Sequence, residues 1–236
     1  MRYYMSCMKA TLVFLLSIAV FFIFFDSFGA DMEPFQRGLR HYADGDFEVA
    51  ASYLEEAKHR QSRNDRVYFY LGNVYFQLDR LDDAIINYTT GLNFAERKGR
   101  FFYNLGNCYY LKKNYSFAAD MYSKALEHDP GLVQSHLNAG NAFYRMGEYE
   151  DTVSQWETYL AKDPQTPQYA EIKKAIAYLK DRLASGPGTE VDAAAADQEL
   201  MNEVMRDLDQ LVESTRSIME TSEKPVDDLT VEGIER

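Results

Sequence analysis

Basic side chains are scarce in this sequence. The 25 Lys and Arg are outnumbered by 37 Asp and Glu, which gives a formal net charge of −12. The excess is uneven, because residues 30–182 hold 22 acidic and 19 basic side chains, whereas residues 185–236 hold 14 and 4. The basic field that neutralises phosphates is therefore missing, and we expect no nucleic-acid partner. The acidity belongs to the C-terminal part of the chain.

Motifs for catalysis are also missing. The sequence contains no nucleophile motif and no phosphate-binding loop. None of the four histidines stands at a metal-ligand spacing from a cysteine or a pair of carboxylates; they are His41, His59, His128 and His136. We therefore predict a protein that is not an enzyme and that has no catalytic residue, no cofactor and no metal site.

Cysteine is nearly absent, with Cys7 and Cys108 as the two instances. Cys7 lies in the N-terminal segment, so removal of that segment would leave one thiol and no internal disulfide. Stability must then come from an apolar core, for which 18 Tyr and 15 Phe provide large side chains. Cys108 lies two residues after a glycine at a tightly packed position, and we expect it to be a buried, inert thiol.

A long apolar run occupies residues 10–25, with Arg2 and Lys9 before it. Its length is short for a spanning helix of about 20 residues and suits the core of a signal peptide. The preceding positive charge orients such a segment so that the rest of the chain is exported. We predict that residues 1–29 are a signal peptide cleaved before Ala30, or alternatively an uncleaved inner-membrane anchor. Either form places the remainder in the bacterial periplasm or envelope.

Internal repetition dominates the middle of the chain. A glycine returns every 34 residues, at Gly38, Gly72, Gly106 and Gly140. Three residues after each glycine stands a ring, at His41, Tyr75, Tyr109 and Phe143. Small residues follow the same step at Ala50, Ala84 and Ala118, with Thr152 in the fourth copy. The pattern indicates four copies of one structural unit that bury their apolar faces by stacking.

The repeat resembles the tetratricopeptide repeat, a pair of antiparallel helices. The closest matches to its first helix are residues 103–110 (YNLGNCYY) and 137–144 (LNAGNAFY), and Asp129-Pro130 and Asp163-Pro164 end the third and fourth units. The resemblance implies an all-α, right-handed α-solenoid of four helix pairs. The repeats would cover about residues 31–64, 65–98, 99–132 and 133–166.

An amphipathic helix is expected directly after the fourth unit, over residues 167–184. Apolar side chains recur there at helical spacing, at Tyr169, Ile172, Ile176, Leu179 and Leu183. Such a helix covers the open end of a solenoid. The predicted repeat domain, with this capping helix, is therefore residues 30–184.

The resemblance also implies a groove, because the first helix of each tetratricopeptide unit lines the concave side. The candidate peptide-binding residues are Arg66, Phe69, Asn73, Phe76, Arg100, Tyr103, Asn107, Tyr110, Asn141, Tyr144 and Arg145. Among them, three asparagines lie one repeat apart, and primary amides can both donate to and accept from an extended peptide backbone. The arginines could hold a carboxylate. Alternatively, asparagine is a common default of the family here, and the tyrosines pack between helices.

Two lysine positions of the family's clamp for a C-terminal carboxylate are occupied by Phe69 and Tyr103. We therefore expect no clamp of that chaperone type. The partner is predicted to be an extended peptide segment or a protein subunit of unspecified identity.

The C-terminal tail, residues 185–236, has no aromatic side chain and reads as largely disordered. Within it, residues 197–219 carry a thin apolar stripe at helical spacing, formed by Leu200, Val204, Leu208, Leu211 and Ile218, with Met201 and Met205 nearby. An isolated helix of this length is marginal in water and needs a partner. We expect it to dock on another protein or to fold back onto the arginine-bearing groove, unless the tail is simply solvated.

These features together predict a non-catalytic scaffold or adaptor in the bacterial cell envelope, which binds its partner in the concave groove. The alternative is an accessory subunit of an envelope enzyme complex whose chemistry lies in another chain. The order of export segment, repeats and short tail also loosely resembles the repeat proteins of bacterial aerotolerance (Bat-type) clusters. Membrane association is possible through residues 10–25.

Overall fold

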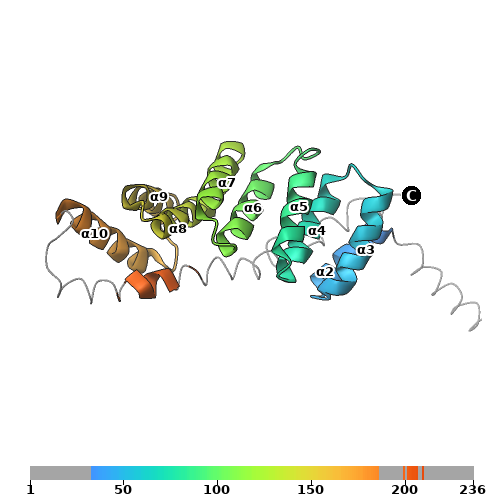
Figure 1. The fold of residues 1–236 in the computed structure, drawn as a ribbon, viewed down its shortest axis with the longest axis horizontal. Coiled ribbons are helices and arrows are strands. Elements are labelled where there is room, and N and C mark those ends of the chain that lie inside the picture. Colours follow the sequence, from blue (N-terminus) through green and yellow to red (C-terminus); the bar gives the residue numbers. More distant parts are fainter. Residues whose placement is uncertain (1–32, 186–198, 200, 207–208, 210–236) are drawn as a thin grey trace, which may run out of the picture.

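The computed structural model describes residues 33–185, 199, 201–206 and 209. All regular structure in these residues is α-helical, and the helices form a row of antiparallel pairs (Figure 1). The predicted export segment 1–29 and most of the tail lie outside the described residues. No helix among the residues described has both the length and the apolar character needed to span a membrane.

Each of the four sequence repeats forms one helix pair, as predicted. The pairs are α2 (Pro34–Ala43) with α3 (Phe47–Arg60), α4 (Asp65–Gln77) with α5 (Leu81–Gly91), α6 (Gly99–Leu111) with α7 (Tyr115–His128), and α8 (Gln134–Met146) with α9 (Tyr149–Lys162). The capping helix α10 (Tyr169–Ser185) packs against α9. The predicted all-α solenoid with a C-terminal cap is thereby confirmed.

The repeating glycines let the two helices of a pair approach each other closely. A Cβ atom at Gly72 would collide with the ring of Tyr88, one at Gly106 with Tyr122, and one at Gly140 with the ring of Trp156. In the first repeat the same place is taken by Leu54 against Gly38. The ring therefore occupies the volume that any larger side chain at the glycine would need.

The turn inside each repeat uses one residue with a positive φ, and these residues are again 34 apart. Gly45 and Gly147 supply it in the outer repeats, with φ of 80° and 79°. Asp79 and Lys113 adopt φ of 57° and 59° in the inner two. Only glycine enters this left-handed region without steric cost, so the inner turns accept some strain to keep the same geometry.

The first helices of successive repeats lie along one side of the row, and contacts between α2 and α4 and between α6 and α8 join them. We call this side the first-helix face.

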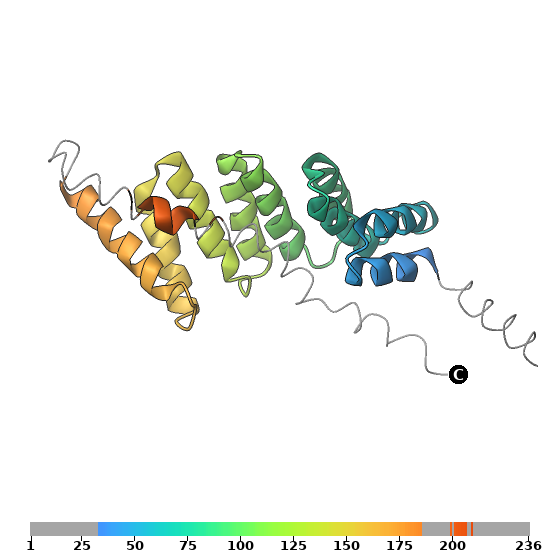
Figure 2. The same cartoon turned by 90° about the horizontal axis from the view of Figure 1, so that it is seen from below.

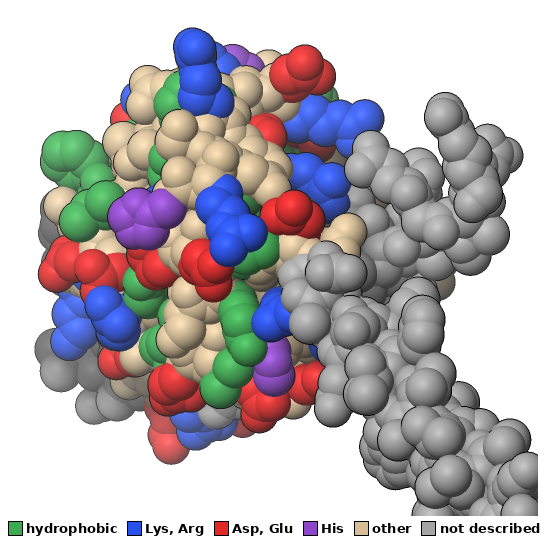
Figure 3. Space-filling view, turned by 90° about the vertical axis from the view of Figure 1, so that its right-hand side faces the viewer, with side chains coloured by type: hydrophobic (Ala, Val, Ile, Leu, Met, Phe, Trp, Pro, Cys, Tyr) green, Lys and Arg blue, Asp and Glu red, His purple; other side chains and the backbone are tan. Residues whose placement is uncertain are grey.

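On the end of the molecule formed by α2 and α3, acidic and basic side chains are interspersed on the visible surface (Figure 3).

Part of the acidic tail returns to the solenoid. Residues 201–206 are helical and lie across the C-terminal helix pairs (Figures 1 and 2). Met201, Val204 and Met205 are buried there, in one apolar cluster with side chains of α8, α9 and α10. We call residues 201–206 together with Asp209 the tail segment.

Candidate binding face

The three asparagines expected to contact a ligand lie inside the solenoid. Asn73, Asn107 and Asn141 are at most 1% exposed. Each accepts a hydrogen bond from the aromatic side chain 15 residues later: Tyr88 donates to Asn73 Oδ1 at 2.7 Å, Tyr122 to Asn107 Oδ1 at 2.8 Å, and Trp156 Nε1 to Asn141 Oδ1 at 3.0 Å. The prediction that these amides face the groove is therefore wrong. The alternative interpretation, in which asparagine is a common default of the family at this position, agrees with their burial.

A second set of amides links each repeat to the next. Asn104 Nδ2 donates to Asn73 Oδ1 at 3.1 Å, and Asn138 Nδ2 donates to Asn107 Oδ1 at 3.2 Å. Burial raises the pKa of the Tyr88 and Tyr122 phenols well above its ordinary value, so both stay protonated and donate. We call this buried network of asparagines and rings the amide ladder. It joins repeats rather than binding a ligand.

The remaining aromatic candidates differ in how accessible they are. Phe76 is fully buried in the core, which corrects its assignment to the groove. Phe69 is half-buried and packs edge-on against Phe101 at 5.1 Å between ring centroids. Tyr103 is half-buried, and its hydroxyl accepts a hydrogen bond from Asn138 at 3.3 Å. Much of this aromatic surface thus stabilises the stack of helices.

The three predicted arginines lie on the first-helix face and are exposed. The guanidinium of Arg66 lies over the ring of Phe35, 5.3 Å from its centroid. Arg100 stands at the start of α6, near the middle of the row. Arg145, near the end of α8, forms an ion pair with Asp209 of the tail segment. The structure therefore brings Arg145 onto a carboxylate of this same chain.

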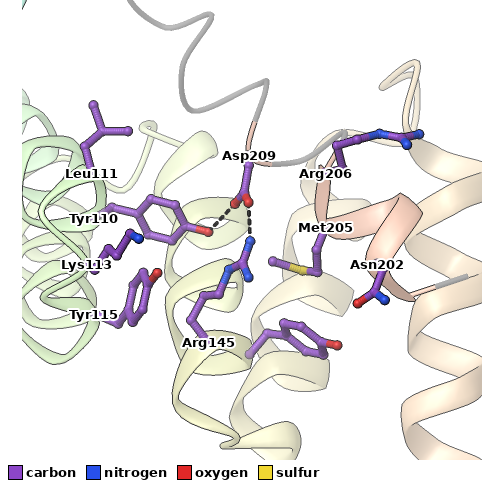
Figure 4. Close-up of a pocket in the computed structure, with 10 residues that line it drawn as sticks. Tyr110, Leu111, Lys113, Tyr115, Arg145, Asn202, Met205, Arg206 and Asp209 are labelled. Atoms are coloured by element: carbon purple, nitrogen blue, oxygen red, sulfur yellow. Dashed lines mark hydrogen bonds and ion pairs between the residues drawn. The ribbon is translucent and has the colours of Figure 1, made fainter. Parts of the chain in front are cut away.

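An open pocket of about 610 Å³ lies beside this ion pair. Its walls come from the third repeat, the fourth repeat and the tail segment (Figure 4). The lining residues are Tyr110, Leu111, Lys113, Tyr115, Tyr144, Arg145, Asn202, Met205, Arg206 and Asp209. Three of the predicted groove residues, Tyr110, Tyr144 and Arg145, thus meet at one place.

Asp209 is held through both of its carboxylate oxygens. Tyr110 donates to Asp209 Oδ1 at 2.5 Å, and Arg145 donates to Asp209 Oδ2 (Figure 4). Burial raises the pKa of Tyr110, and the hydrogen bond to the Asp209 carboxylate raises it further. The phenol is therefore a neutral donor at physiological pH, and the arginine supplies the positive charge. This arrangement recognises an anion that presents two oxygens.

Beside the carboxylate lies the apolar half of the contact. Met201, Val204 and Met205 are 0%, 3% and 2% exposed. Their cluster includes Leu137 of α8 and Ile176 of α10. Val204 is the one member of the predicted apolar stripe among the described residues, and Leu200, Leu208, Leu211 and Ile218 lie outside them. Val204 of the predicted stripe is buried, and so are Met201 and Met205, which the prediction placed only near the stripe.

Seven of the ten lining residues were not among the predicted groove residues, and Asp209 and Lys113 are two of them. Asp209 was one acidic side chain among many in the tail, and Lys113 was not among the groove candidates. A spacing argument could have singled out Asp209, because it follows Met205 by four residues and so lies on the same side of a helix. Its pairing with Tyr110 and Arg145 depends on where the tail crosses the repeats.

Potential metal ligands gather at one place among the described residues. Ligand atoms of His41, Asp44 and Asp46 lie within 4.8 Å of one another at the turn between α2 and α3. Both carboxylates are exposed, and His41 Nδ1 is 3.3 Å from Asp46 Oδ2. Exposed acidic groups often gather without a metal, so closeness alone does not define a site. Cys108 is buried, as predicted.

Comparison with known protein families matches two parts of the chain. A tetratricopeptide repeat model matches residues 35–90, and a second tetratricopeptide repeat model matches residues 99–132. These ranges hold the first two helix pairs and the third. A search of curated proteins finds no match to the sequence.

Several solved structures share the fold. A crystal structure of MamA protein is 15% identical over 86% of this chain and 96% of its own, with a TM-score of 0.58. A second MamA crystal structure gives 15% identity over 76% and 96%, with a TM-score of 0.57. The Cut9–Hcn1 hetero-tetramer of APC/C is 19% identical over 59% of this chain and 28% of that chain, with a TM-score of 0.53. At these identities the likeness establishes the fold alone.

Proposed function

We propose that this chain, whose helix pairs are tetratricopeptide repeats, is a non-catalytic scaffold that holds a segment of a partner protein on its first-helix face. The observation that carries the proposal is the tail segment, which this face already holds as a short helix. Three buried apolar side chains make that contact, together with one carboxylate whose two oxygens accept hydrogen bonds from Tyr110 and Arg145. A face built in this way binds a peptide segment by the helix-in-groove mode.

The proposed location is the bacterial cell envelope. Its support comes from the sequence, where residues 10–25 form an apolar run preceded by Arg2 and Lys9. A fusion of alkaline phosphatase to the C-terminus tests it, because that enzyme is active only outside the cytoplasm. We expect activity from the full chain and none after deletion of residues 1–29. Equal activity of the two fusions would remove the export proposal.

Photo-crosslinking in the producing cell tests the scaffold function. A photoreactive amino acid is placed at Arg100 on the first-helix face, and a matched one at Ile86 of α5, which is 61% exposed. We expect a discrete partner adduct from position 100 and none from position 86. Mass spectrometry separates this adduct from internal crosslinks. A first-helix face that yields no partner adduct, or the same adducts as position 86, would contradict the proposal.

A further inference from the structure

We propose that the surface that holds the tail segment recognises a partner helix of the same chemistry, and that the tail must leave before this helix binds. The partner helix carries apolar side chains at positions i, i+3 and i+4 and a carboxylate at i+8. In this chain Met201, Val204, Met205 and Asp209 occupy those positions. The inference rests on the proposed scaffold function and specifies its site and its ligand class.

The apolar half of the surface sets the spacing of the ligand. Positions i, i+3 and i+4 lie on one face of a helix. The side chains at these positions enter a cluster whose other members include Ile172, Ile176 and Leu179 of α10. The polar residues between them, Asn202 and Glu203, are exposed. The surface therefore contacts only the apolar side chains on one face of the bound helix. Methionine at these positions adapts to an irregular apolar patch.

The carboxylate half sets the direction and register of the ligand. Tyr110 comes from the third repeat and Arg145 from the fourth, and each donates to a different oxygen of Asp209. Asp209 follows Met205 by four residues, which is about one helical turn. A bound helix is therefore correctly placed only when its stripe lies against α10 and its acid lies between the two repeats. A partner helix with a basic or apolar residue at i+8 would leave Arg145 without its counter-ion.

The tail segment is suited to give way to a competitor. A helix of the predicted length, residues 197–219, is marginal in water on its own. Its tether to the repeats supplies a high effective concentration, so its occupancy of the surface does not rest on these contacts alone. Glu203 and Arg206 pair with each other at 3.9 Å, so that ion pair lies within the tail itself. A partner with the same stripe and acid gains the same contacts when it replaces the tail.

A labelled synthetic peptide of residues 197–213 serves as the probe, and its binding to the full-length chain is followed by fluorescence anisotropy. The wild-type chain is expected to bind it weakly, because its own tail occupies the surface. Asp209→Lys in the full-length chain removes the internal carboxylate without changing an apolar contact. It is expected to tighten peptide binding by about tenfold, because the fraction of chains whose surface is not covered by their own tail rises by about that factor.

Charge reversal at the receiving surface tests the register. Arg145→Glu, added to a chain that carries Asp209→Ala so that no new internal ion pair forms, is expected to weaken binding of the peptide by at least about tenfold. The same peptide carrying Asp209→Arg is expected to restore it. Arg60→Glu is the matched control, because Arg60 lies on α3 and pairs with Glu56 of its own helix. That control should leave peptide binding unchanged.

Three results would overturn the inference. The first is a chain with Asp209→Lys that binds the peptide no more tightly than the wild type. The second is peptide binding that is indifferent to Arg145→Glu. The third is concentration-dependent dimerisation of the wild-type chain in sedimentation that Asp209→Lys weakens, because the occupant would then be the tail of a second copy. If a partner still crosslinks at position 100 in the Arg145→Glu chain, the proposed scaffold function stands and only the proposed role of this surface is contradicted.

Discussion

The junctions inside the solenoid and the junction at its C-terminal end are built differently. Between repeats two and three, and between three and four, an asparagine donates across the boundary to the asparagine of the preceding repeat, at Asn104 and Asn138. One repeat further on, the equivalent position is Ile172 of α10, which is fully buried among apolar side chains. The amide ladder thus stops where the cap begins.

This difference shows how the chain ends a stack that could otherwise continue. An amide at a boundary is satisfied only if the next repeat supplies a donor or acceptor, because a buried polar group without a partner costs free energy. An isoleucine at the boundary needs only apolar neighbours. Part of that apolar surface is then completed by Met201 and Val204 of the tail segment. The same change that ends the stack also creates the surface on which the tail lies.

The largest expected effect on stability comes from removing the ring of Trp156, which donates to Asn141 at the C-terminal end of the amide ladder. Trp156 is fully buried and packs into the space left by Gly140. Trp156→Ala should lower the free energy of unfolding by about 3–5 kcal/mol, because it opens a cavity in the C-terminal cluster. Urea denaturation followed by circular dichroism measures this change. A loss as small as that of an exposed substitution such as Ser123→Ala would show that the Trp156 ring does not support the cap.

A smaller effect separates the two kinds of junction directly. Asn107 Oδ1 accepts from both Tyr122 and Asn138, whereas Trp156 is the one donor to Asn141 Oδ1 in the described part of the chain. Tyr122→Phe should therefore cost roughly 1 kcal/mol of unfolding free energy, since one donor remains. Trp156→Phe should cost about 1–3 kcal/mol, because it leaves the buried oxygen unpaired and also reduces packing.

Denaturation of the two variants side by side checks this order. A double variant of Tyr122→Phe with Asn138→Ala removes both donors from Asn107. It should then lose more than the sum of the single changes. Equal losses for Tyr122→Phe and Trp156→Phe would mean that the second donor at the inner junction contributes nothing.

The smallest effect on global stability is expected in the tail segment. Asp209→Asn removes the ion pair with Arg145 yet keeps the size of the side chain. The free energy of global unfolding should stay within about 0.5 kcal/mol of the wild type. Backbone amide exchange in residues 201–206 should become faster, because the segment opens locally without unfolding the repeats. Hydrogen–deuterium exchange with mass spectrometry reports both, and a slower exchange in this region would contradict the assigned role of the ion pair.

Much of the fold could be predicted because small and large residues recur in the sequence at a fixed spacing of 34 residues. Gly72, Gly106 and Gly140 predict close helix pairs, and the structure places a ring against each of them. The candidate groove was less predictable. The 34-residue step identifies equivalent positions, but it does not determine how far each first helix is rotated about its own axis. Asn73 and its equivalents were therefore assigned to the surface although the rotation turns them inward.

The tail shows the same limit from the other side. Its stripe predicts an amphipathic helix in need of a partner, and the arginines of the groove suggest where an acidic segment could return. Which acid meets which arginine depends on the path of the chain across the repeats, and this path brings Asp209 to Arg145 and Tyr110.

The sequence by itself determined the repeat, the number of helix pairs and the cap, because local spacing and side-chain size specify which helices can pack closely. Only the tertiary structure decided which polar side chains lie inside and which acid closes the contact with the tail. Those outcomes depend on helix rotation and on contacts between residues as distant as Tyr110 and Asp209. A repeating pattern carries no information about either.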